Sequence, residues 1–187
     1  MAVIDRQKWD KVYSHPQREF PTAPAALLAH ADCLMPGNLL DVACGEGAVS
    51  LYMAARDGYP TTAIDISQTG LDRLSVFARD EQLTISTQCL DLDDWQQLST
   101  LGTYQSITLF RYKPSRELLS ALICALLPGG RLLFSSFNMQ HHHSSGFSQR
   151  FCLQPREFVD LTGSKLIAYI SSSSAPFTDT YIFEKPQ

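Results

Sequence analysis

The sequence of 187 residues has few charged side chains and no long apolar run. Asp, Glu, Lys and Arg make up 18% of it, the formal net charge is −4, and no Lys/Arg-rich cluster occurs. This disfavours nucleic acid as a partner, because binding to a phosphate backbone normally needs a basic patch. No stretch approaches the roughly 18 apolar residues of a membrane span, and Asp5, Arg6 and Lys8 interrupt the start where a secretory signal would be apolar. We therefore expect a cytoplasmic protein without a membrane partner.

Side chains that could bind a metal are few and poorly spaced. The cysteines are Cys33, Cys44, Cys89, Cys124 and Cys152, an odd number without a Cys-x-x-Cys pair. Their spacing predicts neither a disulfide framework nor a cysteine zinc site. His141, His142 and His143 are consecutive, and adjacent side chains point in different directions in a helix or a strand. We therefore expect no metal site, and we expect residues 138–154 to form an exposed loop that could gate a binding site.

Short apolar runs alternate along the chain with segments of helical spacing. This pattern predicts an α/β fold with parallel strands joined by crossover helices. The expected strands are 38–42, 61–66, 83–90, 106–110, 131–137, 166–170 and 181–184. Ser67 and Ser115 each precede a helical pattern and are expected to be its N-cap. The helix that follows Ser115 is expected to end at Pro128–Gly130, and Pro155 is expected to begin a further, short helix. The length favours a single domain, with residues 1–34 as an N-terminal cap segment.

The turn after the first strand carries the main chemical signal. It reads Asp41-Val-Ala-Cys-Gly45-Glu-Gly47 and leads into a helix. Glycine has no Cβ, so a ligand can lie close to the main chain, and the free N–H groups of a helix N-terminus favour an anionic or polar group. In an open α/β sheet this turn lies at the carboxyl ends of the strands, where ligands bind. The turn therefore predicts a cradle for a small ligand.

Two further carboxylates end the next two strands. Asp65 comes twenty residues after Gly45, at a place where a carboxylate can bind both hydroxyls of a ribose. Asp91 ends the third strand, where it could bind the exocyclic amine of a base. Aspartate also commonly ends strands and caps turns for structural reasons, but three such residues at one edge favour binding. A dinucleotide-binding G-x-G-x-x-G pattern lacks its third glycine here, which makes an NAD-dependent oxidoreductase the weaker alternative.

In combination, these segments resemble class I S-adenosylmethionine-dependent methyltransferases. DVACGEG is similar to motif I of that family, AIDIS to its acidic loop, QCLDLDDW to its adenine-binding motif and LLPGGRLLFSSF to the segment that leads into its fifth strand. The resemblance covers residues 36–137, and WDKVYS and FRYKPSRELL add a weaker likeness to the subgroup related to tellurite-resistance methyltransferases. Two residues depart from the pattern: Ala43 replaces the first glycine of motif I, and Gln105 replaces the aspartate before the fourth strand.

The resemblance implies a Rossmann-like three-layer sandwich with a mostly parallel seven-stranded sheet whose last strand is antiparallel. It also implies S-adenosylmethionine as cofactor. The residues implied to bind it are Asp41, Ala43, Cys44, Gly45, Gly47, Asp65, Ile66, Asp91 and Leu92. Gly45 and Gly47 would face the methionine portion, Asp65 the ribose and Asp91 the adenine amine. Asp41 would orient the turn and the methionine ammonium, while Ile66 and Leu92 would supply apolar contacts to the base.

The expected activity is transfer of a methyl group to a small-molecule acceptor. Arg111 and Tyr112 follow the fourth strand and could contact an acceptor, although a surface arginine is an equal alternative. Tyr13 could join an aromatic lid over the cofactor or simply belong to the core. Because an in-line displacement needs alignment more than a base, we assign no catalytic residue. A cofactor-binding module without catalysis is the alternative, and neither the acceptor nor the oligomeric state is predicted.

Overall fold

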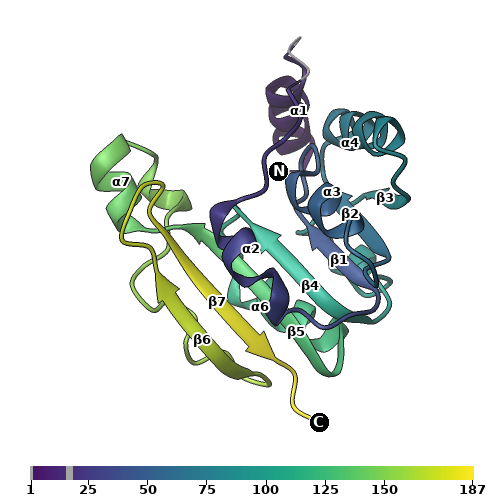
Figure 1. Cartoon of the computed structure of the whole chain (residues 1–187). Coiled ribbons are helices and arrows are strands. Elements are labelled where there is room, and N and C mark those ends of the chain that lie inside the picture. Colours follow the sequence, from purple (N-terminus) through teal and green to yellow (C-terminus); the bar gives the residue numbers. More distant parts are fainter. Residues whose placement is uncertain (1, 16–18) are drawn as a thin grey trace.

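The computed structural model describes residues 2–15 and 19–187, and seven strands of this part of the chain form one sheet (Figure 1). The strands are β1 (Leu39–Val42), β2 (Thr61–Asp65), β3 (Ile85–Cys89), β4 (Tyr104–Phe110), β5 (Leu126–Phe137), β6 (Lys165–Ser171) and β7 (Thr178–Glu184). Their order is β3-β2-β1-β4-β5-β7-β6. All pairs from β3 to β5 are parallel, and β7 lies antiparallel between β5 and β6. The predicted sheet with an antiparallel last strand is confirmed.

Helices cover both faces of this sheet. They are α1 (Ala2–Tyr13), α2 (Ala25–His30), α3 (Ala48–Ala54), α4 (Gln68–Asp80), α5 (Trp95–Leu98), α6 (Arg116–Ala125) and α7 (Met139–Ser145), with 3-10 turns at Ala31–Cys33 and Gln149–Phe151. Neighbouring residues of a strand point to opposite faces. Leu40 of β1 thus packs in one cluster with Leu119 of α6, and Leu39 packs in another with Leu27 of α2 and Met53 of α3. The three layers are confirmed, and both faces are buried, as is typical of parallel sheets.

The two predicted serine caps are present. The Ser67 hydroxyl accepts a hydrogen bond from the Gly70 N–H at 3.1 Å, at the start of α4. The Ser115 hydroxyl accepts one from the Leu118 N–H, also at 3.1 Å, at the start of α6. Each cap satisfies an N–H group that the first turn of a helix leaves without a partner. The caps therefore determine the residues at which the two crossover helices α4 and α6 begin.

Three local predictions were wrong. Residues 138–154 do not form one loop, because α7 occupies Met139–Ser145 and contains all three consecutive histidines. The Asn138 side chain caps this helix by accepting hydrogen bonds from the N–H groups of Gln140 and His141. The Pro-Gly-Gly sequence does not end α6, because β5 already begins at Leu126, which pairs with Tyr104. Pro-Gly-Gly instead lies in an irregular part of β5, before Arg131 pairs with Ser106. The segment from Pro155 forms turns instead of a helix.

Helix α1 lies at the carboxyl ends of the parallel strands, where it packs against α4, whereas α2 lies over a face of the sheet (Figure 1). The Asp10 carboxylate accepts from the Ser67 hydroxyl at 2.6 Å and from the Thr69 N–H at 3.1 Å. Both donors belong to the start of α4, so α1 is tied to the same corner that Ser67 caps. Met1 and residues 16–18 of the predicted cap segment lie outside the described residues. No helix in the described ranges is long and apolar enough to cross a membrane.

Replacing Ser115 with alanine should lower the free energy of unfolding by about 1 kcal/mol, which is the usual cost of removing a helix N-cap. The physical reason is that the Leu118 N–H loses its acceptor. Ser120→Ala in the same helix is the matched control, because the Ser120 hydroxyl only donates to the Arg116 carbonyl one turn earlier. Urea denaturation measures both variants, and an equal loss of stability in the two would contradict the capping role.

Candidate ligand-binding site

The turn between β1 and α3 bends through three residues with positive φ. Ala43, Gly45 and Gly47 have φ values of 54°, 56° and 91°. A Cβ on Gly47 would overlap the Leu74 side chain of α4, and a Cβ on Gly45 would overlap the Tyr13 hydroxyl of α1. Ala43 adopts the left-handed conformation with a side chain present, which costs roughly 1–2 kcal/mol. The turn thus needs glycine where α1 and α4 approach it, and both Gly45 and Gly47 are buried there against the Tyr13 and Leu74 side chains.

Asp65 ends β2 directly beneath this turn. Its Oδ2 accepts from the Gly45 N–H and its Oδ1 from the Ser67 N–H, both at 2.8 Å. The side chain is 6% exposed. Burial raises the pKa of Asp65, and the hydrogen bonds from Ser67 and Gly45 partly oppose that effect. The structure therefore brings together the turn and the carboxylate that the sequence singled out separately.

Asp41 lies inside the protein beneath the turn. Its two carboxylate oxygens accept from the Ser50 hydroxyl at 2.5 Å and from the Thr108 hydroxyl at 2.8 Å. The residue is 1% exposed, and burial raises its pKa to about 7 in spite of these two hydrogen bonds. Asp41 consequently links β1 to α3 and β4, the elements on either side of the turn, through its two hydrogen bonds.

The third predicted carboxylate stands at the same edge of the sheet. The parallel pairing of β2 and β3 places Asp65 opposite Cys89, two residues before Asp91. Asp91 is half-buried, and its Oδ1 accepts from the Asp93 N–H at 3.0 Å. Ile66 is also half-buried beside Asp65, whereas Leu92 is 8% exposed within the main core cluster. Asp65, Ile66 and Asp91 therefore lie together at the carboxyl ends of β2 and β3, and Leu92 contributes mostly to the core.

Tyr13 covers the turn from the side of α1. Its hydroxyl lies against Gly45, and Trp9 stacks on its ring with centroids 6.0 Å apart. Burial is the largest effect that raises the pKa of Tyr13, the charge of Asp65 raises it further, and the charge of Arg111 lowers it. Asp65 and Arg111 therefore both lie close enough to Tyr13 for their charges to act on its hydroxyl.

Sequence reasoning missed two residues that hold this arrangement. Asp10 binds the start of α4, and Glu46 of the turn forms a 2.7 Å ion pair with Arg73 of α4. A signal for Asp10 exists, because in WDKVYS it precedes Tyr13 by nearly one helical turn and so lies on the same face of α1. Glu46 carries no such signal, because its partner is 27 residues away in the sequence.

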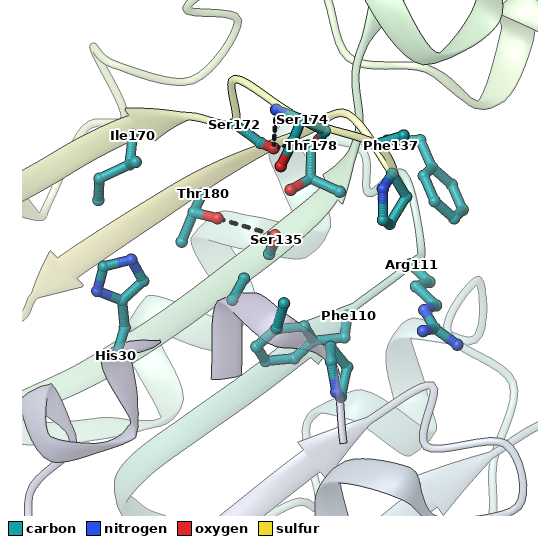
Figure 2. Close-up of a pocket in the computed structure, with 15 residues that line it drawn as sticks. His30, Phe110, Arg111, Ser135, Phe137, Ile170, Ser172, Ser174, Thr178 and Thr180 are labelled. Atoms are coloured by element: carbon teal, nitrogen blue, oxygen red, sulfur yellow. Dashed lines mark hydrogen bonds between the residues drawn. The ribbon is translucent and has the colours of Figure 1, made fainter. Parts of the chain in front are cut away.

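A cavity of about 170 Å³ lies beside the turn, between α2 and the ends of β4, β5 and β7 (Figure 2). Residues that shape it include His30, Phe110, Arg111, Ser135, Phe137 and Thr180. Arg111 follows β4 with φ 56°, and its N–H donates to the Ser135 carbonyl at 2.9 Å. Tyr112, which the sequence also singled out, packs against the main core cluster.

The walls of this cavity come only in part from the segments expected to form an acceptor pocket. The N-terminal segment contributes His30 and Pro24, as expected. The opposite wall comes from the connection between β6 and β7, including Ser172 and Pro176, and not from residues 138–154. No pattern in the sequence predicts this wall, because the connection between β6 and β7 reaches the cavity only once β7 has paired with β5.

The sheet order, the glycine turn and the strand-end carboxylates together define a Rossmann-like domain with a site for a small ligand at its carboxyl edge. Residues 39–130 match the family model described as "Methyltransferase domain". The ubiquinone biosynthesis O-methyltransferase of Idiomarina loihiensis is 30% identical over 112 residues, 58% of this chain and 46% of that protein. The Coxiella burnetii enzyme of the same name is 31% identical over 54% of this chain and 44% of its own length. The chain spans about half the length of these relatives.

A solved structure agrees with the observed fold. The N-methyltransferase NodS from Bradyrhizobium japonicum, in complex with S-adenosyl-L-homocysteine, has a TM-score of 0.73 at 18% identity, covering 97% of this chain and 98% of NodS. This similarity extends over the N-terminal segment and the final strands, which the family match leaves out. At this level of identity the structural match shows a shared fold, and the match to the methyltransferase domain model covers the part of the chain that contains the glycine turn, Asp65 and Asp91.

Asp41→Asn should remove a pH dependence of stability from the protein. The pKa of Asp41 is raised to about 7 in the folded state, compared with about 3.9 in an unfolded chain. Between these values the folded protein binds a proton that the unfolded chain has released, so the free energy of unfolding falls as pH rises from about 4 to 7. The asparagine variant lacks this titration. Its stability relative to the original protein should therefore increase over that range by up to about 4 kcal/mol.

Urea denaturation of both proteins at several pH values measures this difference. Asp80→Asn is the matched control, since Asp80 is exposed at the end of α4. Titration of Asp65 occurs in both proteins and largely cancels in the comparison. A stability difference between Asp41→Asn and the original protein that stays constant with pH would show that Asp41 ionises normally in the folded state.

Proposed function

We propose that the protein transfers a methyl group from S-adenosylmethionine to a small-molecule acceptor. The observation that carries this proposal is the buried contact between the Asp65 carboxylate and the Gly45 N–H, at 2.8 Å. It joins the strand-end acid to the glycine turn inside the segment that matches a methyltransferase domain. The relatives named as ubiquinone biosynthesis O-methyltransferases support a small-molecule acceptor.

The residues around the turn fit this cofactor. Each oxygen of Asp65 accepts one N–H, and a carboxylate has about four acceptor sites, so both oxygens retain capacity for the two hydroxyls of a ribose. The same reasoning leaves Asp91 free to accept from an adenine amine, with Ile66 beside the base. The main chain from Ala43 to Gly47 would face the methionine portion, and Leu92 would close the adenine end of the site.

The protein's own contribution to the reaction would be alignment and exclusion of water. Bound S-adenosylmethionine supplies a methyl group on a positively charged sulfur, which is already a good leaving group. Tyr13 covers the turn, and Asp10 holds α1 in place over it. Arg111 stands between the turn and the cavity, where it can orient an acceptor. Orientation of this kind can contribute several kcal/mol to lowering a reaction barrier.

Two finer assignments complete the proposal. We assign the chain to the subgroup related to tellurite-resistance methyltransferases, on the basis of WDKVYS and FRYKPSRELL. WDKVYS contains both Asp10 and Tyr13, which contact the site in the structure. We also propose a cytoplasmic location, on the basis of the cysteine usage.

Asp65→Asn should weaken binding of S-adenosylmethionine at least tenfold, because the amide cannot accept from both ribose hydroxyls while it also holds the turn. A hydrogen bond to a charged group typically contributes about 1.5–3 kcal/mol, which corresponds to roughly 10- to 100-fold in affinity. Calorimetric titration with S-adenosylmethionine and S-adenosylhomocysteine measures the effect. Asp80→Asn is the control that should leave affinity unchanged.

Turnover separates an enzyme from a module that only binds the cofactor. Production of S-adenosylhomocysteine that depends on an added acceptor would support methyl transfer, and binding without turnover against a broad acceptor screen would favour the module. If the folded protein binds neither S-adenosylmethionine nor S-adenosylhomocysteine, the proposed function is wrong. A urea denaturation curve of Asp65→Asn establishes that any loss of binding is not a loss of the fold.

A further inference from the structure

We infer that the acceptor is a small anionic molecule built on a single ring, and that it binds in the cavity between Arg111 and His30. That this ligand accepts the methyl group rests on the proposed function, whereas its charge and size follow from the residues that line the cavity. Charge, size and a central pair of buried hydroxyl groups support the inference independently.

The charge of the cavity is opposite in sign to that of the whole chain. Among the described residues that line it, the ionisable side chains are Arg111 and His30, and no carboxylate is present. The formal net charge of the protein is −4, so this wall departs from the average surface. Arginine stays protonated at all physiological pH values and presents several donors in one plane, which suits a carboxylate. A cavity of this kind favours an anion over a neutral or cationic ligand.

The alternation of side chains along β7 keeps the nearest acid away. Thr178 and Thr180 line the cavity, and Asp179 between them points to the opposite face of the sheet. There its carboxylate accepts from the Tyr169 hydroxyl at 2.9 Å and from the Asn138 amide at 2.8 Å. Asp179 is 1% exposed, so it does not offset the positive charge on the cavity side.

The centre of the cavity contains two buried hydroxyl groups. The Ser135 and Thr180 oxygens lie 2.9 Å apart, and the two residues are only 2% and 3% exposed. Figure 2 shows this pair between His30 at one end and Arg111 at the other. One hydroxyl donates to the other, which leaves one donor and free acceptor sites for a ligand. A ligand that spans the cavity would therefore meet a cation, a hydroxyl pair and then an imidazole.

The size and apolar walls of the cavity fit a ring. Its volume is about 170 Å³, and a cavity of about 150 Å³ accommodates benzene. The aromatic side chains of Phe110 and Phe137 and the apolar side chains of Ile170 and Pro176 line it. One six-membered ring with a small charged substituent matches this volume. Aromatic side chains also favour a flat ring, which can stack on them or meet them edge to face.

Arg111 lines the cavity and leaves the sheet at the same edge as the glycine turn, because β1 and β4 are parallel neighbours in which Val42 pairs with Leu109. The Arg111 φ of 56° turns the chain away from the direction of β4, and the hydrogen bond from its N–H to the Ser135 carbonyl holds that conformation. Strained residues of this kind concentrate at functional sites. The charge of Arg111 also acts on Tyr13, whose hydroxyl lies against Gly45. An anion paired with Arg111 thus lies beside the proposed cofactor site.

Calorimetry with benzoate and with neutral benzamide tests the inference on the intact protein saturated with S-adenosylhomocysteine, which prevents turnover. The three hydroxybenzoates extend the series to ring carboxylates with a second polar group. We expect at least one ring carboxylate to bind at least tenfold more tightly than benzamide. Arg111→Gln should reduce that affinity at least tenfold, and His30→Gln should reduce it severalfold. Arg79→Gln, an exposed arginine of α4, is the matched control and should leave it unchanged.

The outcomes separate this inference from the proposed function. Equal binding of benzamide and the carboxylates, or full retention of carboxylate binding in a folded Arg111→Gln variant, would overturn the inference. Normal S-adenosylhomocysteine binding without binding of any ring carboxylate would also overturn it, and it would leave the proposed methyl transfer intact. Absence of S-adenosylhomocysteine binding would contradict the proposed function, and carboxylate binding to the free protein would still report on the cavity.

Discussion

The hydrogen bonds from the N–H groups of Gly45 and Ser67 to the buried carboxylate of Asp65 hold the strand-end corner of this protein together. One bond ties the turn after β1 to the end of β2, and the other ties β2 to the start of α4. Ser67 in turn caps α4 and donates to Asp10 of α1. Hydrogen bonds to an ionised acceptor are stronger than neutral ones. The placement of the turn, of α4 and of α1 therefore depends on one carboxylate, which is also the proposed ribose ligand.

Two residues at the same corner adopt states that cost free energy of folding, and the rest of the fold compensates for this cost. Ala43 has a positive φ without being glycine, and Asp41 is buried with a pKa of about 7. Neither feature adds to stability at neutral pH, because one strains the main chain and the other favours a protonated carboxyl. Both belong to the turn whose shape brings the Gly45 N–H to the Asp65 carboxylate. The apolar side chains buried on both faces of the sheet stabilise the fold enough to offset this cost.

The site combines two parts with different origins. The proposed cofactor side is built from consecutive β-α units, in which Gly45, Asp65 and Asp91 each lie at or just after the end of a strand and meet because parallel strands end at one edge. The proposed acceptor side is built from distant segments, with His30 from α2, Arg111 after β4 and Thr180 from the antiparallel β7. A chain of this architecture can change the second part without disturbing the first, since the two share few residues.

Local sequence alone determined the seven strands, the caps at Ser67 and Ser115 and the identity of the turn residues, because each depends on spacing or on a side chain that bonds to its own neighbourhood. It misjudged residues 138–154 and the Pro-Gly-Gly segment, where one Asn138 cap and the pairing of Leu126 with Tyr104 outweighed local composition. Only the tertiary structure decided that Asp41 lies below the turn, that Asp10 holds α1 and that the cavity faces Arg111 and His30. These features depend on contacts between residues far apart in sequence, and no spacing along the chain encodes which distant side chain a buried group will meet.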